Sequence, residues 1–351
     1  MNTMPPPTRS LSVRDETKPF VLIGAIAVGI ALNRLAGGTL RHYGWIVRVG
    51  LFVVIFSVMA FVEIGNVGAA FRKRKPTAIA ITTNYAVVPL FAWSLGWLIL
   101  RGYPDLWAGV ILYTLTPCIG WYLIFIDLAH GDIDWGLALL PIDIILQIVL
   151  LPLYLWLLVG KVIPIDLLTL VRSVSVFLLL PFAAAYAART VLRRLRGSVF
   201  VNGPYKQVIG ELKMWALVAV VAGIFTTQPR LENAQLRQVG LIIVTITLFF
   251  VGLFILALTI GRVFKLGYPD TTTMVFEVTA RNSESVIGIA AVVFAARPLV
   301  TLAILVGPVI ELPALLVLSK VMLQLRTRWT WPNAARDARG SDSGVTLSRA
   351  Q

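Results

Sequence analysis

Ten apolar stretches dominate the sequence, and each is close to the length that crosses a lipid bilayer as a helix, about 20 residues. We predict them at residues 20–36, 44–65, 78–100, 107–129, 135–159, 167–190, 209–227, 238–262, 270–296 and 299–325. Charged residues make up only 14% of the 351 residues, against about a quarter in soluble domains, and the mean hydropathy is +0.84. The sequence therefore predicts an all-α polytopic membrane protein with ten transmembrane helices.

The ten stretches form two sets of five, separated by the linker 191–208. The predicted divisions are a polar tail (1–19), a first five-helix repeat (20–159), the start of a second repeat with span six and the cytoplasmic linker (160–208, span six at 167–190), the rest of that repeat (209–325) and a second polar tail (326–351). After five spans the chain enters from the opposite face. Similar halves would therefore form an inverted repeat.

Lysine and arginine cluster on one side of this topology. The clusters occupy 72–75, 193–206 and both tails, whereas the opposite loops carry isolated residues such as Arg101 and Arg297. Cytoplasmic loops carry such an excess, which explains the net charge of +14 without a nucleic-acid partner. We expect both termini to be cytoplasmic and the protein to lie in the cell (inner) membrane.

Two of the stretches are interrupted in the middle, and each is fourth in its set. The first interruption is Thr116-Pro117-Cys118 and the second is Ala280-Arg281-Asn282-Ser283-Glu284. Pro117 lacks a backbone donor and disrupts a helix interior. Broken helices at matching places in two halves indicate the binding site of a secondary transporter. We expect helices four and nine to cross near the bilayer midplane.

The only cysteine of the chain, Cys118, lies in the first interruption. A free cysteine is often a small buried hydrophobe. Beside unwound backbone, its thiol would instead suit a soft, thiophilic solute. One thiol forms one reversible bond, which suits a substrate that must leave again.

Carboxylates at membrane depth are functional candidates, because burying them is costly. Glu311 lies deep in the last stretch between Pro308 and Pro313. It is interpreted either as a carboxylate paired with a buried arginine or as a protonatable site that exchanges protons near neutral pH, and we favour the second interpretation. Glu277, Arg281, Asn282 and Glu284 form a polar cluster in span nine. This cluster is interpreted either as an internally neutralised network or as an ion or proton site, and the two interpretations are compatible.

Other polar residues carry weaker signals. Asn84 is a candidate substrate ligand, and Glu63, Asp143 and Gln147 are further candidates within spans. Asp127, His130, Asp132 and Asp134 would suit a divalent cation in an intramembrane enzyme, although such clusters are more often solvated loops. The chain has no Walker A motif, so we predict no ATP-binding domain. Uphill transport would use an ion gradient, the membrane potential or a partner ATPase, and we expect neither a cofactor nor a requirement for the ATPase.

Several of these motifs resemble those of the Acr3-type arsenite efflux permeases. Thr116–Trp121 through Asp127–Asp132 is similar to the family's cysteine-bearing fourth span, Asn282-Ser283-Glu284 to its Asn-Phe-Glu, and Gly307–Pro313 to its Gly-Pro-(apolar)2-Glu-(apolar)-Pro. That family belongs with the bile acid/sodium symporters in a fold of two inverted five-helix repeats. The resemblance implies export of arsenite, and often antimonite, against protons. By position it makes Cys118 the essential thiol and Glu311 the essential carboxylate.

Two positions depart from the family pattern. Pro117 stands where the family usually has arginine, and Arg281 where it usually has a second asparagine. Glu277 is better matched by the bile acid branch, in which a Glu-(Xaa)3-Gln-Asn sequence binds sodium. Arg281 stands at the glutamine of that sequence, and its cation would compete with sodium. We therefore favour proton coupling over sodium coupling.

The leading hypothesis is a secondary transporter that exports arsenite and uses protons. The alternative is a sodium-coupled symporter for an organic anion, which Glu277 favours and Arg281 opposes. A distant third is the metal-dependent intramembrane enzyme, which leaves both interruptions unexplained.

Overall fold

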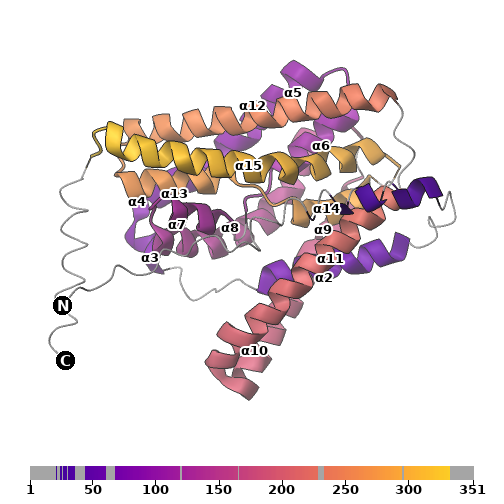
Figure 1. Cartoon of the computed structure of the whole chain (residues 1–351), viewed down its shortest axis with the longest axis horizontal. Coiled ribbons are helices and arrows are strands. Elements are labelled where there is room, and N and C mark those ends of the chain that lie inside the picture. Colours follow the sequence, from indigo (N-terminus) through magenta and orange to yellow (C-terminus); the bar gives the residue numbers. More distant parts are fainter. Residues whose placement is uncertain are drawn as a thin grey trace.

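The computed structural model describes residues 44–60, 68–118, 121–164, 166–227, 233–294 and 296–332, together with 21, 24, 25, 27–29 and 31–35. Within these ranges the regular structure is helical, apart from one isolated bridge of extended backbone (Figure 1). Glu63 and the pair Ile119–Gly120 lie outside the described residues.

The α-helices run in chain order, with short π-helical stretches between some of them. The first half contains α2 (Gly44–Ala60), α3 (Gly68–Arg72), α4 (Arg74–Thr82), η3 (Thr83–Val87), α5 (Val88–Leu100), α6 (Pro104–Thr114), α7 (Trp121–Leu128), α8 (Ile133–Tyr154) and η4 (Leu155–Val159). The second half contains α9 (Leu167–Val174), η5 (Ser175–Leu179), α10 (Leu180–Phe200), η6 (Val201–Tyr205), α11 (Lys206–Thr227), α12 (Asn233–Val263), α13 (Tyr268–Thr279), α14 (Ser283–Val293) and α15 (Pro298–Arg328).

Four continuous helical segments among the described residues are long and apolar enough to cross a bilayer. They are Arg74–Leu100, Ile133–Val159, Arg237–Val263 and Pro298–Arg328. Each coincides with a predicted span. The described part of the chain is thus a helical membrane protein.

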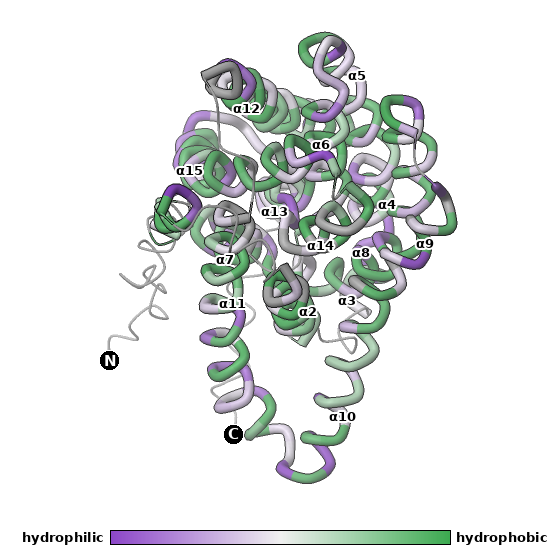
Figure 2. The backbone as a smooth tube through the Cα atoms, turned by 90° about the vertical axis from the view of Figure 1, so that its right-hand side faces the viewer, coloured by the Kyte–Doolittle hydropathy of each residue, from purple (hydrophilic) through white to green (hydrophobic). Residues whose placement is uncertain are grey.

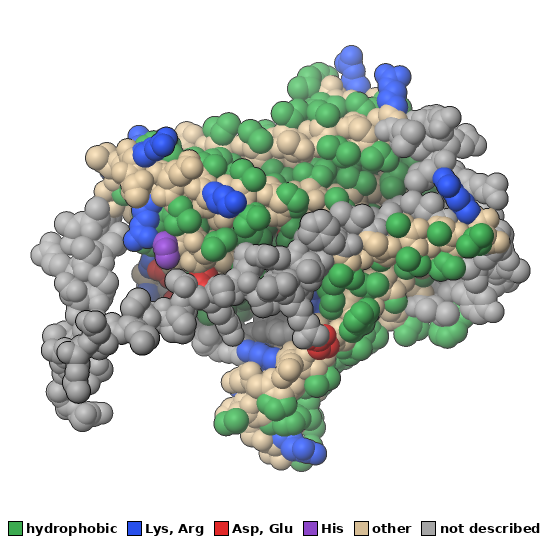
Figure 3. All heavy atoms as spheres, in the orientation of Figure 1, with side chains coloured by type: hydrophobic (Ala, Val, Ile, Leu, Met, Phe, Trp, Pro, Cys, Tyr) green, Lys and Arg blue, Asp and Glu red, His purple; other side chains and the backbone are tan. Residues whose placement is uncertain are grey.

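Helix α12 shows how such a segment divides between lipid and protein. Its exposed side chains Val244, Leu248, Val251 and Ile255 recur at helical spacing. The buried side chains on its other face are Ile242, Ile246, Phe249, Phe250, Leu253 and Ala257. Figure 3 shows hydrophobic side chains over much of the surface between the ends of the long helices. One face of α12 therefore belongs to the core and the other is suited to hydrocarbon.

The helices pack in two groups. In the larger group α15 contacts α6, α12 and α14, while α12 contacts α13 and α5 contacts α6. In the smaller group α2 packs against α10 and α11, and these two helices project from the body of the protein (Figures 1 and 2). Helix α14 joins the groups through contacts with α2 and α9.

The segment predicted as the linker between repeats, 191–208, is helical except at Gly197, where non-helical φ and ψ angles of 79° and 171° separate two helical pieces. Helix α10 continues to Phe200 with a kink at Gly197, whose φ of 79° is one that glycine adopts without strain. The tail predicted from residue 326 likewise begins inside α15, which ends at Arg328. Both helices continue beyond their apolar portions into segments rich in arginine and lysine, because these residues have high helix propensity.

Candidate functional site

The two interrupted helices meet at their interruptions. Helix α6 ends at Thr114 and α7 begins at Trp121, while α13 ends at Thr279 and α14 begins at Ser283. Between them Pro117 and Arg281 form an antiparallel bridge. The Cys118 N–H donates to the Ala280 carbonyl at 3.1 Å, and the Asn282 N–H donates to the Thr116 carbonyl at 2.9 Å. Backbone N–H and carbonyl groups that lack helical partners at one break therefore form hydrogen bonds with those of the other break. Lipid could not provide these hydrogen bonds.

This pairing explains why proline is accepted at position 117. The two hydrogen bonds come from the neighbours of the bridged pair, so the backbone nitrogens of Pro117 and Arg281 point away from each other. Pro117 needs no donor in this arrangement. The Arg281 N–H is available for another partner, and it donates to Oε1 of Glu311 at 2.8 Å.

The second interruption is shorter than the sequence suggested. Ser283 and Glu284 belong to α14, because Asn282 caps this helix: its Oδ1 accepts from the Ser285 N–H at 3.1 Å, and its Nδ2 donates to the Ser285 hydroxyl at 2.7 Å. The Thr116 hydroxyl donates to the Asn282 carbonyl at 2.9 Å and ties the cap to the first break. The Glu284 side chain is outside the described part.

Glu311 lies on α15, which passes through Pro308 and Pro313 without interruption. The side chain is buried, and its Oε2 accepts from the Tyr113 hydroxyl at 2.8 Å. Gly307 makes room for this tyrosine, since a Cβ there would lie 2.4 Å from Tyr113 Cε2. Glu311 therefore bonds both interrupted spans, to α6 through Tyr113 and to the second break through Arg281.

Arg281 reaches Asn84 as well. Its Nη2 donates to Asn84 Oδ1 at 3.0 Å, and Asn84 Nδ2 donates to Glu277 Oε1 at 2.7 Å. Asn84 lies in the π-helical stretch η3, a distortion that often marks functional positions. Five buried residues thus form one chain of hydrogen bonds, Glu277, Asn84, Arg281, Glu311 and Tyr113, in which the backbone N–H of Arg281 makes the link to Glu311.

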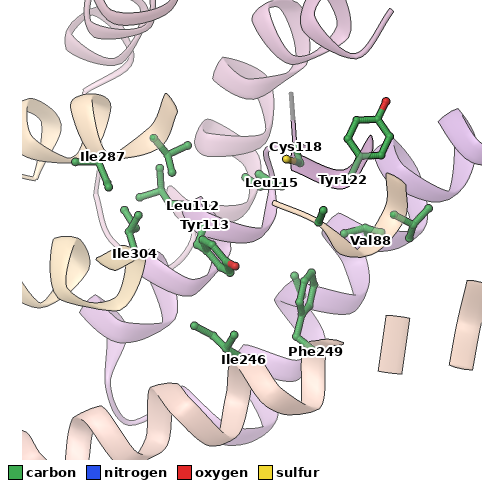
Figure 4. Packing of buried hydrophobic residues seen from close by; sticks show 14 of the residues in the cluster. Val88, Leu112, Tyr113, Leu115, Cys118, Tyr122, Ile246, Phe249, Ile287 and Ile304 are labelled. Atoms are coloured by element: carbon green, nitrogen blue, oxygen red, sulfur yellow. The ribbon is translucent and has the colours of Figure 1, made fainter. Parts of the chain in front are cut away.

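Cys118 lies at the bridge itself, and its side chain is 4% exposed. It belongs to the hydrophobic cluster that also contains Leu115, Tyr122 and Phe249 (Figure 4). The hydrogen bond from its N–H to the Ala280 carbonyl places Cys118 directly beside the second break.

A second polar group adjoins this network on α8. Asp143 and Gln147, one helical turn apart, are both buried, and the Tyr85 hydroxyl donates to the Asp143 carbonyl at 2.8 Å. Asp143 Oδ2, both amide atoms of Gln147 and Glu277 Oε2 have no hydrogen-bond partner among the described residues. These atoms give the site spare capacity to bind water or protons.

The acidic residues after α7 do not assemble as a metal centre. Asp132 caps α8 by accepting from the Trp135 N–H at 2.9 Å, and its other oxygen pairs with Lys73 at 2.5 Å. Among the described residues, no three acidic, histidine or cysteine side chains are grouped to hold a metal ion.

The Lys73 ion pairs have no counterpart in the sequence-based predictions. Lys73 also pairs with Asp270, so it joins the starts of α4, α8 and α13. Burial lowers the pKa of Lys73, but hydrogen bonds and charge attraction from Asp132 and Asp270 outweigh it and raise the pKa above its usual value.

The fold and the crossing define a class: a membrane transport protein built around interrupted helices that meet at a buried polar site. Comparison with known sequences gives the family. The sequence model of the Sodium Bile acid symporter family matches residues 48–231, just over half of the chain. The chain belongs to this family.

Its relatives include proteins named for arsenical resistance. The chain is 24% identical over 350 residues to the arsenical-resistance protein Acr3 of Corynebacterium glutamicum, covering 93% of this chain and 94% of that protein. It is 23% identical over 333 residues to the Acr3 protein of Alkaliphilus metalliredigens, with 89% and 92% covered. An uncharacterized transporter of Synechocystis is 23% identical over 324 residues, with 84% and 85% covered. These similarities confirm the resemblance of the chain to the Acr3-type proteins.

Proposed function

We propose that this protein is a secondary transporter that exports arsenite across the cytoplasmic membrane. One observation carries the proposal: the only thiol of the chain lies in the backbone pairing of the two interrupted helices. The nearby Arg281–Glu311 contact supplies a carboxylate. The names of two relatives support the substrate.

The proposed architecture is ten spans in two inverted repeats of five. In this scheme the four long apolar segments are spans three, five, eight and ten, and the interrupted helices are spans four and nine. The packing of α5 on α6 has a counterpart in the packing of α12 on α13. This correspondence supports the repeat.

The proposed orientation has both termini in the cytoplasm. Contacts bring together the start of α4, the end of α12, the start of α13 and the end of α15: Lys75 donates to the Phe264 carbonyl, Arg262 lies over Trp329 and Arg326 over Tyr268. This end gathers Arg72 to Lys75, Lys265 and Arg328, and such clusters favour the cytoplasmic side.

The proposed substrate chemistry is a reversible exchange at sulfur. Neutral As(OH)3 and the Cys118 thiol give an S–As(OH)2 adduct and one water, and hydrolysis restores both reactants. Unwound backbone near Asn282 offers hydrogen bonds to the remaining hydroxyls, and Asn84 orients the network behind it. Antimonite, as Sb(OH)3, has the same chemistry, so we include it as a substrate.

The proposed coupling step is protonation of Glu311. As a carboxylate, Glu311 accepts from Tyr113 and from the Arg281 backbone. Protonation removes one acceptor and weakens the attachment of the second break to α15. Exchange of a proton for arsenite would then accompany rocking of one helix group against the other.

Growth of an arsenite-sensitive host tests the proposal. Cells with the wild type should grow on arsenite and retain little of it, whereas Cys118→Ser and Glu311→Gln should leave cells sensitive. Glu211→Gln, on α11 in the smaller helix group, is the matched control and should protect as the wild type does. Full resistance with Cys118→Ser and Glu311→Gln would remove these residues from the mechanism.

A further inference from the structure

We infer that the guanidinium of Arg281 is a tethered cation, fixed in an oxygen-lined site that would otherwise take a diffusible monovalent cation. The inference deepens the proposed function, because the same site couples transport. The experiment that tests the inference requires no transported solute. The inference and the proposed function can therefore be contradicted independently of each other.

The site is lined by oxygens from both breaks. Arg281 Nη1 donates to the Thr114 carbonyl at 3.1 Å, Nη2 to the Val278 carbonyl, and Nε to the Thr279 carbonyl at 3.4 Å. Asn84 Oδ1 accepts from Nη2 at 3.0 Å. Every nitrogen of the guanidinium therefore has an oxygen partner, as a buried charge requires.

These carbonyls belong to helix ends. Thr114 is the last residue of α6, and Val278 and Thr279 are the last two of α13. Terminal carbonyls lack intrahelical partners and carry the negative end of the helix dipole. Carbonyl and amide oxygens at unwound helix ends are the ligands that bind hard monovalent cations in transporters of this general design.

Acidic side chains supply the counter-charge. Glu277 is connected to the guanidinium through Asn84, and Glu311 contacts the backbone of the same arginine. The Phe249 ring lies 5.9 Å from the guanidinium carbon and closes one side. Asp143, Tyr85 and Tyr113 complete the titratable groups that interact electrostatically with Arg281. Two carboxylates therefore interact electrostatically with one fixed positive charge: Glu277 is linked to the guanidinium through Asn84, and Glu311 is bonded to the backbone N–H of the arginine.

The fixed charge has a functional consequence. Arginine stays protonated in proteins, so the cation cannot leave with the solute or respond to a sodium gradient. It neutralises one of the two nearest carboxylates and leaves the other as the group that exchanges a proton. A chain with this arginine is therefore independent of sodium.

Thermal unfolding of the purified full-length protein in detergent tests the inference. The midpoint is measured at constant ionic strength in choline chloride, in sodium chloride and in guanidinium chloride far below denaturing concentrations. The wild type should have the same midpoint in all three. Arg281→Gln should have a lower midpoint in choline, raised by several degrees and saturably by sodium or guanidinium, because a ligand that binds only the folded state stabilises it.

Two control variants sharpen the comparison. Arg297→Gln, which removes an arginine from its 2.7 Å pair with Asp105, should show no specific response to the cations. Arg281→Lys retains a tethered charge and should also be unresponsive. Identical responses of Arg281→Gln and Arg297→Gln, or a specific sodium effect on the wild type, would overturn the inference.

Failure of Arg281→Gln to accumulate would also be informative. The tethered-cation account then predicts that Arg281→Lys accumulates and that Arg281→Gln is recovered by combining it with Glu277→Gln, which removes the uncompensated charge. Loss of both of these proteins would contradict the account.

Discussion

At the scale of single residues, Glu311 joins the two interrupted spans. Its two oxygens accept from different elements, the Tyr113 hydroxyl and the Arg281 backbone. These two hydrogen bonds fix the position of the buried carboxylate, and loss of either donor removes a bond to one of the interrupted spans. Buried polar atoms left unpaired cost about 1–3 kcal/mol each.

Tyr113→Phe removes one of these donors while retaining the ring. We predict that the free energy of unfolding falls by about 1–3 kcal/mol and that arsenite transport slows. Thermal unfolding and transport rates measure the two effects. Tyr186→Phe, on an exposed tyrosine of α10, is the control, and equal behaviour of the two variants would show that the Tyr113–Glu311 bond carries no weight.

Residue types alone indicated part of the site. A lone cysteine at a break and a carboxylate in mid-membrane are rare enough to be noticed, and Cys118, Glu311 and Arg281 were candidates on that basis. Tyr113 was missed, because a tyrosine in an apolar helix has the same signature as any core aromatic residue. The Asn84 bridge was also missed, since it joins residues separated by 193 positions.

At the scale of elements, the breaks are stable because they pair with each other. Neither interruption could satisfy its backbone alone in hydrocarbon. Three contacts connect or cap the two breaks: the bridge between Pro117 and Arg281, the hydrogen bond of the Thr116 hydroxyl and the Asn282 cap. The first break is therefore stabilised mainly by its pairing with the second break, and Pro117 contributes less.

Pro117→Ala tests this view. The alanine N–H would point away from the bridge, and both flanking hydrogen bonds would remain. We predict a loss of about 1–4 kcal/mol, which combines about 0.4–1 kcal/mol from the greater freedom of the unfolded chain with about 1–3 kcal/mol for the added buried N–H, with transport retained. Denaturation and transport assays check this, and a collapse of transport would mean that proline itself keeps the helix broken.

Lys73 joins the starts of three helices, and its contribution depends on pH. Because its pKa is raised above the usual 10.5, the ion pairs contribute fully below that value and are lost as the pH rises through the raised pKa. We predict that Lys73→Met lowers the unfolding midpoint at neutral pH and that the difference from wild type shrinks above about pH 10.5.

Midpoints over a pH series measure this, with Lys161→Met, an exposed lysine near the end of η4, as the control. A difference that stays constant into strongly alkaline solution would contradict the ion-pair assignment.

At this scale, features that depend on residues close together in the sequence could be predicted, and features that depend on distant residues could not. The four long apolar segments could be predicted because they depend on runs of apolar residues, and the two breaks could be predicted because a proline or charged residues interrupt such runs. The helical course of 191–208 was not, because charge marks the end of an apolar run without marking the end of a helix. The Lys73 ion pairs depend on tertiary contacts between residues 59 and 197 positions apart, and no local signal reports them.

At the scale of the whole molecule, the proposed inverted repeat and the proposed cytoplasmic position of the basic cluster make a prediction about topology. The chain has a single cysteine, Cys118, so Cys118→Ser provides a background for single-cysteine variants. In that background Arg101→Cys should react with an impermeant maleimide in intact cells, and Lys265→Cys only in everted vesicles. Labelling of both from the same side would reject the proposed orientation.

The central claim is that the paired breaks form an arsenite pathway in which Cys118 binds the solute and Glu311 couples its movement to protons. Arsenite uptake into everted vesicles under an imposed proton gradient tests this most directly. The account predicts gradient-dependent uptake by the wild type in sodium-free buffer, and uptake at background level by Cys118→Ser and Glu311→Gln. Equal uptake by all three proteins, or uptake that appears only with sodium, would contradict it.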